Sequence, residues 1–254
     1  MGVLPLPYVP PLWRESRAGF EAARLLRSPV WRGEGVPPGD GRAVLLIPGF
    51  LAGDGSLATM SRWLRAAGYR TGRAGIRANV GCSQAACEQL EERLERLADR
   101  SGAPVTIIGQ SRGGVLAKAL AARRPELVSG VVALGSPSRS MLRVHPLVLA
   151  QVGLVAALGS SRVPGLFTLR CLRGACCEPF RRALEGPFPE DVRYVSIYSR
   201  SDGIVDWRAC VDPAADENVE VDASHLGMGL NGAVYREVAR VLGAGVDGGL
   251  RRAA

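Results

Sequence analysis

The chain has 254 residues, of which 47% are apolar and 22% charged, a balance that suits one sizeable globular core and excludes a disordered chain. The net charge of +8 comes almost entirely from arginine, because Lys118 is the only lysine. The arginines are scattered through every segment and form no basic run with interleaved aromatic residues, so we expect no nucleic-acid partner. The longest apolar stretch, about residues 146–159, is shorter than the ~20 residues that a membrane-spanning helix needs.

Residues 1–41 are expected to form an N-terminal extension. Met1 to Leu12 contains four prolines, and Arg14 follows the apolar part instead of preceding it, unlike a signal peptide. We therefore expect a cytoplasmic protein, with secretion as the open alternative. Apolar residues then recur at helical spacing over residues 12–32 with arginines between them, which predicts a basic amphipathic helix. Two roles remain open for this helix: packing on the domain, or peripheral contact with a membrane surface or an apolar substrate.

Residues 42–254 alternate between apolar runs typical of buried strands and stripes of helical spacing. This alternation predicts an α/β fold, with a mostly parallel central sheet covered by helices on both faces. Residues from about 138 to 190 interrupt the rhythm, and we expect a helical cap or lid insertion there because a structureless loop of that length is uncommon. The expected strands cover residues 43–47, 69–74, 104–108, 130–134, 192–198 and 217–221, and the expected helices cover 57–67, 86–97, 112–123 and 232–242.

The strongest motif is Gly109-Gln110-Ser111-Arg112-Gly113, which matches G-x-S-x-G between an expected strand and an expected helix. In that setting a serine occupies a sharp turn that lifts its hydroxyl out of the sheet. Ser111 also stands at a helix N-terminus, where partial positive charge stabilises a developing oxyanion. The motif therefore predicts Ser111 as a nucleophile.

A serine nucleophile needs a base, and the chain has two histidines. His225 follows the last expected strand, where ligand chemistry collects in α/β folds, whereas His145 lies in the expected cap. The base needs an acid to orient it, and Asp202 comes first after the strand that ends at Tyr198, with Asp206 in reserve. The order Ser111, Asp202, His225 is that of α/β-hydrolases.

The oxyanion of an acyl-transfer intermediate needs two backbone N–H donors. One is expected from Arg112, the residue after the nucleophile. The other is expected from Phe50, because Gly49 follows the first core strand and lets the chain turn there. A Pro-Gly pair is also an ordinary turn, so this assignment depends on the structure.

Six cysteines do not make a disulfide scaffold at this length. The spacing contains no Cys-x-x-Cys pair and no histidine partners, so we expect no metal site and interpret the cysteines as buried thiols. One disulfide remains open, either Cys82 to Cys87 or within the cluster Cys171, Cys176 and Cys177.

About four fifths of the chain, residues 42–242, resembles the α/β-hydrolase superfamily and, within it, the bacterial triacylglycerol lipases and esterases. The resemblance rests on Pro48-Gly49-Phe50, the Ser111 motif, Ser201-Asp202-Gly203 and Ser224-His225. Many such lipases have His-Gly where this chain has Pro48-Gly49, so a side chain that can brace the loop is missing here. The resemblance implies that the insertion at 138–190 is a lid over an acyl pocket.

These residues predict a serine hydrolase that cleaves carboxylic esters, small or lipid-like, with apolar acyl chains. No metal or organic cofactor is required, and the oligomeric state is open. A thioesterase or an acyltransferase would use the same residues. A non-catalytic relative that binds a partner or a membrane, and a metal-dependent or redox protein that uses the cysteine cluster, are the alternatives from other classes.

Overall fold

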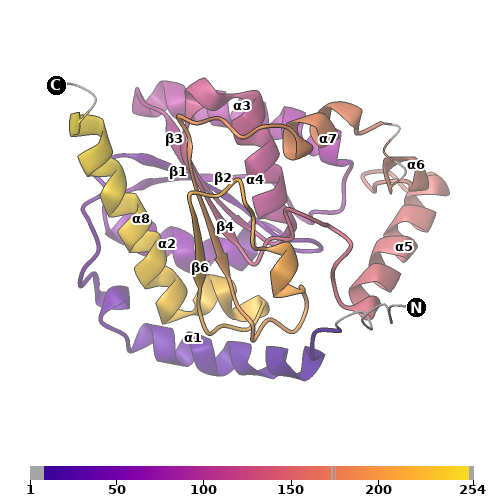
Figure 1. The fold of residues 1–254 in the computed structure, drawn as a ribbon, viewed down its shortest axis with the longest axis horizontal. Helices are drawn as coiled ribbons and strands as arrows, with labels where there is room; N and C mark the ends of the chain where they lie inside the picture. Colours follow the sequence, from indigo (N-terminus) through magenta and orange to yellow (C-terminus); the bar gives the residue numbers. More distant parts are fainter. Residues whose placement is uncertain (1–8, 173, 175, 252–254) are drawn as a thin grey trace, which may run out of the picture.

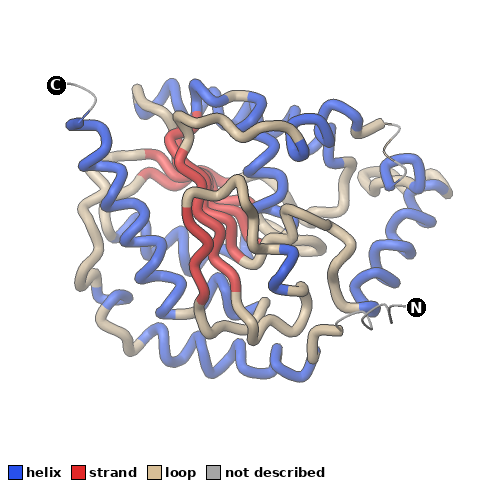
Figure 2. The backbone as a smooth tube through the Cα atoms, viewed as in Figure 1, coloured by secondary structure: helices blue, strands red, loops and turns tan. Residues whose placement is uncertain are grey.

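The computed structural model describes residues 9–251 except 173 and 175. The segment expected to lack a signal peptide therefore lies in part outside the described residues. The centre of the structure is a parallel sheet surrounded by helices (Figure 2). None of the helices in the described ranges is long and apolar enough to cross a membrane.

The sheet has six strands in the order β2-β1-β3-β4-β5-β6, and every neighbouring pair is parallel. The sequence prediction of a mostly parallel sheet is confirmed. β1 is buried along its whole length, as its continuous apolar run requires, whereas β2 lies at the edge and is polar and partly exposed. The strands are β1 (Ala43–Ile47), β2 (Arg70–Arg73), β3 (Val105–Gln110), β4 (Val128–Leu134), β5 (Arg193–Tyr198) and β6 (Glu217–Glu220).

The order of the strands creates a switch point beside β1. The chain leaves β1 toward β2 and then returns to place β3 on the other side of β1. At such a point, the loops after the two central strands diverge, and a crevice opens at the carboxyl ends of the strands where ligands bind. The segment after β1 carries Gly49 and Phe50, and the segment after β3 carries Ser111.

Helices cover both faces of the sheet. One face packs on α3 (Ser83–Ser101), α4 (Arg112–Arg123) and α7 (Glu178–Glu185), and the other packs on α1 (Ala18–Leu26), α2 (Ala58–Ala66) and α8 (Gly232–Arg251). Figure 1 shows these two groups on opposite sides of the strands. The short 3₁₀ helices are η1 (Leu12–Arg17), η2 (Val30–Arg32), η3 (Asp54–Leu57), η4 (Pro125–Leu127), η5 (Trp207–Ala209) and η6 (Leu226–Leu230).

The N-terminal segment packs on the domain next to the carboxyl ends of the strands (Figure 1). The helix expected over residues 12–32 is divided into η1, α1 and η2. Leu25 and Val30 are buried in the same apolar cluster as α8, whereas Trp13 and Phe20 are 72% and 70% exposed. One side of the segment thus holds it on the domain while two large apolar side chains face solvent.

The segment between β4 and β5 contains α5 (Pro146–Ser160), α6 (Leu169–Leu172) and α7. α7 packs against α4 and contributes Phe180 and Leu184 to the core of that face. α5 and α6 lie together to the side of the sheet in Figure 1, around a small apolar cluster that contains Ala156 and Phe167. This part of the insertion stands next to the carboxyl ends of the strands.

Candidate active site

Ser111 sits in a strained turn between β3 and α4. Its backbone has φ 53° and ψ −123°, a conformation that a residue with a side chain rarely adopts. The neighbouring glycines explain how the turn is possible. A Cβ at Gly109 would lie 2.4 Å from the carbonyl carbon of Gly113, and one at Gly113 would lie 2.1 Å from the oxygen of Ile47. The two glycines thus allow β3 and α4 to pass close to each other, so that Ser111 is presented at the end of the sheet.

The loop after β1 approaches this turn closely. A Cβ at Gly49 would lie 3.2 Å from the Cβ of Ser111, so glycine is the residue that lets the two segments meet. Phe50 forms an isolated β-bridge with Asn79, and Asn79 Nδ2 donates a 2.8 Å hydrogen bond to the oxygen of Pro48. Asn79 therefore braces the loop that lacks the histidine found in many lipases. No motif or spacing around Asn79 predicts this role.

The side chain of Arg112, the first residue of α4, holds the segment that contains Asn79 in place. Its guanidinium donates to the oxygens of Asn79 and Gly81, at 2.9 and 2.6 Å, and to Ser83 Oγ at 3.1 Å. The backbone N–H of Arg112 stands at a helix N-terminus, a position without an intrahelical acceptor. Phe50 and Arg112 both line the cavity that Ser111 lines, and their role as oxyanion donors stays a prediction.

His225 and Asp202 are brought together from two separate loops. His225 follows β6 and Asp202 follows β5, and His225 Nδ1 lies 2.7 Å from Asp202 Oδ2. The other oxygen of Asp202 accepts hydrogen bonds from the N–H groups of Ile204 and Val205, at 2.8 and 2.7 Å. The aspartate is therefore fixed by its own loop and points one oxygen at the imidazole.

Asp206, the reserve acid, and His145, the other histidine, have different surroundings. Asp206 caps η5 and pairs with Arg143 at 2.7 Å and Arg208 at 3.3 Å. His145 caps α5, where its Nδ1 accepts a hydrogen bond from the N–H of Leu147. The contacts of both residues are with their own surroundings, and neither is paired with Asp202 or His225 in the described part of the chain.

The imidazole of His225 has a shifted protonation equilibrium. Burial lowers its pKa, but the charge of Asp202, its hydrogen bond and the charge of Glu15 outweigh that effect, so the pKa lies above 6.5. When the imidazole is neutral, the Asp202 carboxylate favours a proton on Nδ1. That tautomer leaves Nε2 unprotonated and able to accept a proton.

Two glutamates of the N-terminal segment hold the histidine loop, and the sequence analysis missed both. Glu15 accepts hydrogen bonds from the N–H groups of Gly203, His225 and Leu226 at 2.8, 2.9 and 2.7 Å. Glu21 is buried and accepts from the N–H and the hydroxyl of Ser224, both at 3.0 Å. The available signal was two acidic residues on a segment otherwise rich in arginine.

Ser111, His225, Phe50 and Arg112 all line one cavity of about 500 Å³, while Asp202 lies behind the histidine, 2% exposed. The rest of the cavity wall is mainly apolar and comes largely from the insertion, with contributions from Leu142, Val144, Val148, Val152, Phe167 and Leu172. The cavity thus brings the residues predicted as nucleophile and base to a mainly apolar surface.

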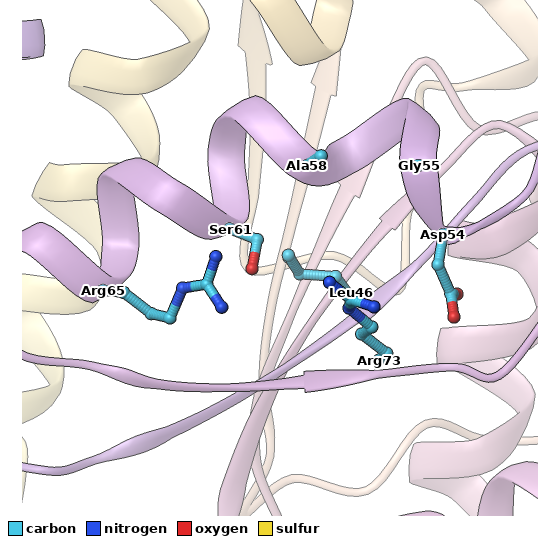
Figure 3. Close-up of a pocket in the computed structure, with 7 residues that line it drawn as sticks. All are labelled: Leu46, Asp54, Gly55, Ala58, Ser61, Arg65 and Arg73. Atoms are coloured by element: carbon cyan, nitrogen blue, oxygen red, sulfur yellow. The ribbon is translucent and has the colours of Figure 1, made fainter.

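A second, smaller hollow of about 110 Å³ lies beneath α2. Figure 3 shows the side chains of Ser61 and Arg65 reaching from α2 toward Leu46 and Arg73. The hydroxyl of Ser61 is hydrogen-bonded to Thr71 Oγ1 at 2.9 Å, and no histidine lines this hollow. It therefore offers no activated nucleophile.

No protein-family model matches the sequence, and no curated protein matches it in sequence. Solved structures do resemble it. A monoacylglycerol lipase from Paleococcus ferrophilus aligns with a TM-score of 0.58 at 14% identity, over 83% of this chain and 96% of the lipase. A lipase from Bacillus licheniformis in its mature form gives 0.59 at 14% identity, over 81% and 94% of the two chains. A methylesterase from Arabidopsis gives 0.54 at 14% identity, over 80% and 99%.

These likenesses extend over most of both chains and agree with the parallel sheet and its covering helices. The chain has the α/β-hydrolase fold.

Proposed function

We propose that the protein is a serine hydrolase that cleaves carboxylic esters with apolar acyl chains. The observation that supports this most directly is the 2.7 Å contact between His225 and Asp202 at a cavity that also contains Ser111 in its strained turn. The solved structures with this fold include lipases and esterases, which supports the same class of reaction.

In the proposed reaction His225 Nε2 removes the proton of Ser111 as Oγ attacks the ester carbonyl. Asp202 stabilises the imidazolium that forms. The N–H groups of Phe50 and Arg112 stabilise the tetrahedral oxyanion, each by about 3 kcal/mol. The imidazolium then protonates the leaving alcohol, and water releases the acyl group from Ser111 by the same steps.

The exposed side chains of the insertion support the proposal that the substrate has an apolar acyl chain and is presented at a lipid surface. α5 is apolar on all sides, and Leu147 and Leu154 are exposed, the latter by 60%, while Val155 and Ala156 are buried. Exposed apolar side chains next to a cavity entrance mark a surface that meets lipid or another apolar partner. Trp13 and Phe20 add two exposed aromatic side chains on the N-terminal segment.

The test is hydrolysis of p-nitrophenyl esters of increasing acyl length by the wild type, Ser111→Ala and the matched control Ser129→Ala, whose hydroxyl is exposed and bonded to Thr106. We expect turnover by the wild type and the control, with a preference for longer chains. Loss of the nucleophile should lower turnover by roughly three orders of magnitude or more. Covalent labelling by a fluorophosphonate should map to Ser111. Equal turnover in all three proteins, or none in any, would overturn the proposal.

A further inference from the structure

Four cysteines meet at one wall of the cavity. Cys82 directly precedes α3, Cys171 belongs to α6, and Cys176 and Cys177 directly precede α7. Their four sulfur atoms all lie within 4.8 Å of one another. Residues almost one hundred positions apart in the sequence are thus gathered at a single point.

The arrangement of the sulfurs differs from that of disulfide pairs. Cys176 Sγ lies 3.1 Å from Cys171, 3.7 Å from Cys177 and 4.0 Å from Cys82, and Cys82 lies 3.4 Å from Cys177. Each sulfur of a disulfide has one partner, whereas Cys176 approaches three. All six cysteines are free thiols, so the bridge from Cys82 to Cys87 considered from the sequence is absent.

The same arrangement suits a tetrahedral metal ion. With Zn–S bonds of about 2.3 Å, the sulfurs of an ideal tetrahedron lie roughly 3.8 Å apart, close to the spacings above. Four thiolates select zinc or iron over calcium and magnesium, which prefer oxygen ligands. The sequence predicts no metal site because it contains no Cys-x-x-Cys pair. The proximity of Cys82 to the other three cysteines exists only in the folded chain.

Arg112 provides an independent observation. Its guanidinium hydrogen-bonds to Gly81 and Ser83, the two neighbours of Cys82, and these acceptors are a carbonyl and a hydroxyl. The other partners of the guanidinium are also neutral: it donates to the oxygen of Asn79 and lies over the ring of Phe167. Arg112 is half-buried, and a cation removed from water without a counter-ion is costly. A zinc ion with four thiolates carries a net charge of −2, which would supply that counter-ion.

We propose that Cys82, Cys171, Cys176 and Cys177 bind one zinc ion and thereby fasten the insertion to the core at the wall of the cavity. Binding forms four Zn–S bonds, releases the four thiol protons to solvent and changes no oxidation state. All four positions are filled by protein, which is the pattern of a structural site, and Cys171 and Cys177 both line the cavity. The inference is independent of ester hydrolysis.

The first test is metal analysis of the full chain purified under reducing conditions, without added metal. We expect one zinc per chain in the wild type and in the control Cys210→Ala, whose cysteine is buried outside the cluster. Cys82→Ser and Cys176→Ser should lose most of the zinc. Zinc retained by both variants, iron in place of zinc, or no metal in the wild type would overturn the proposal.

Two measurements on the wild type do not depend on the folding of any variant. Replacement of zinc by Co²⁺ should produce the sulfur-to-cobalt charge-transfer bands and intense visible bands of a tetrahedral tetrathiolate site. Thiol titration after denaturation should find all six cysteines reduced. A spectrum typical of octahedral cobalt, or a deficit of four thiols that indicates two disulfides, would contradict the site.

The proposed fastening role has its own readout. Removal of the ion by a chelator should increase the rate of limited proteolysis several-fold within residues 160–178 and leave the cleavage rate elsewhere unchanged. Equal protection of that segment with and without the ion would show that zinc does not fasten the insertion.

Discussion

Glu15 Oε1 accepts a 2.9 Å hydrogen bond from the backbone N–H of His225, across 210 positions of sequence. The same oxygen accepts the N–H of Gly203, the residue after Asp202. One carboxylate of the N-terminal segment therefore joins the loop of the proposed base to the loop of its aspartate. The position of the imidazole depends on a residue that lies outside the αβ alternation of the domain.

Glu15→Gln should lower kcat about tenfold. Hydrogen bonds to a charged acceptor contribute about 1.5–3 kcal/mol each, and the NH₂ group of the glutamine would face a backbone N–H that Glu15 now accepts. KM should change little. The acidic limb of the pH profile should also move to lower pH, since the charge of Glu15 raises the pKa of His225. The control is Glu34→Gln, which removes an exposed pair with Arg32. An unchanged pH profile together with unchanged kcat would show that Glu15 has no positioning role.

Asp202→Asn should lower kcat by about three to four orders of magnitude, because the amide no longer selects the imidazole tautomer or stabilises its charged form. Asp206→Asn should retain turnover within a few-fold and lose stability instead, since Asp206 pairs with Arg143 and Arg208. Steady-state kinetics and thermal melts of the two variants separate these effects. The opposite pattern would exchange the roles of the two aspartates.

The pH dependence of kcat/KM should show an acidic limb with an apparent pKa above 6.5. The base must be neutral to accept the proton of Ser111, and the raised pKa of His225 keeps it protonated to a higher pH than a free imidazole. Activity should therefore increase as the pH increases through this value and then reach a plateau. A rate that stays constant between about pH 5 and 9 would count against His225 as the base.

The buried pair between Lys118 and Asp212 should control stability and leave the active site unaffected. Lys118 Nζ lies 2.5 Å from Asp212 Oδ2, and both side chains are almost fully buried. Asp212→Asn should lower the free energy of unfolding by about 3–5 kcal/mol, because it leaves the lysine buried without its counter-ion. Burial raises the pKa of Asp212, but the hydrogen bond from Lys118 and others hold it below 3.8.

The sign of the pH effect follows from that lowered pKa. The contribution of Asp212 to stability is present above pH 3.8 and is lost as the pH falls through its native value. Urea unfolding at neutral and acidic pH should therefore show a difference between wild type and Asp212→Asn that shrinks in acid. A difference that grows in acid would contradict the assignment.

The parts of the protein that could be predicted from sequence are those with local physical causes. β1 and β3 are continuous apolar runs because both faces are buried, and the turn at Ser111 is marked by Gly109 and Gly113, where a Cβ would clash. Strand ends and loop positions then placed Asp202 and His225 at the same edge of the sheet. Each of these inferences needs only a few neighbouring residues.

The residues that the sequence did not predict act through contacts that exist only in the folded chain. Asn79 reaches Pro48 across 31 positions, Glu15 and Glu21 reach the histidine loop from the other end of the chain, and Cys82 approaches Cys177 across 95 positions. The local pattern around these residues does not show which distant partner each of them contacts. Only the topology of the sheet brings them together.

The docking of the N-terminal segment also couples its attachment to the shape of the histidine loop. Leu25 and Val30 belong to the same buried cluster as Met228 and Tyr235, and Trp63 Nε1 donates a 2.8 Å hydrogen bond to the oxygen of Val30. Detachment of the segment would expose these apolar side chains to water and would also take Glu15 and Glu21 away from the loop of His225. Local opening of the segment and loss of the loop geometry are therefore one event.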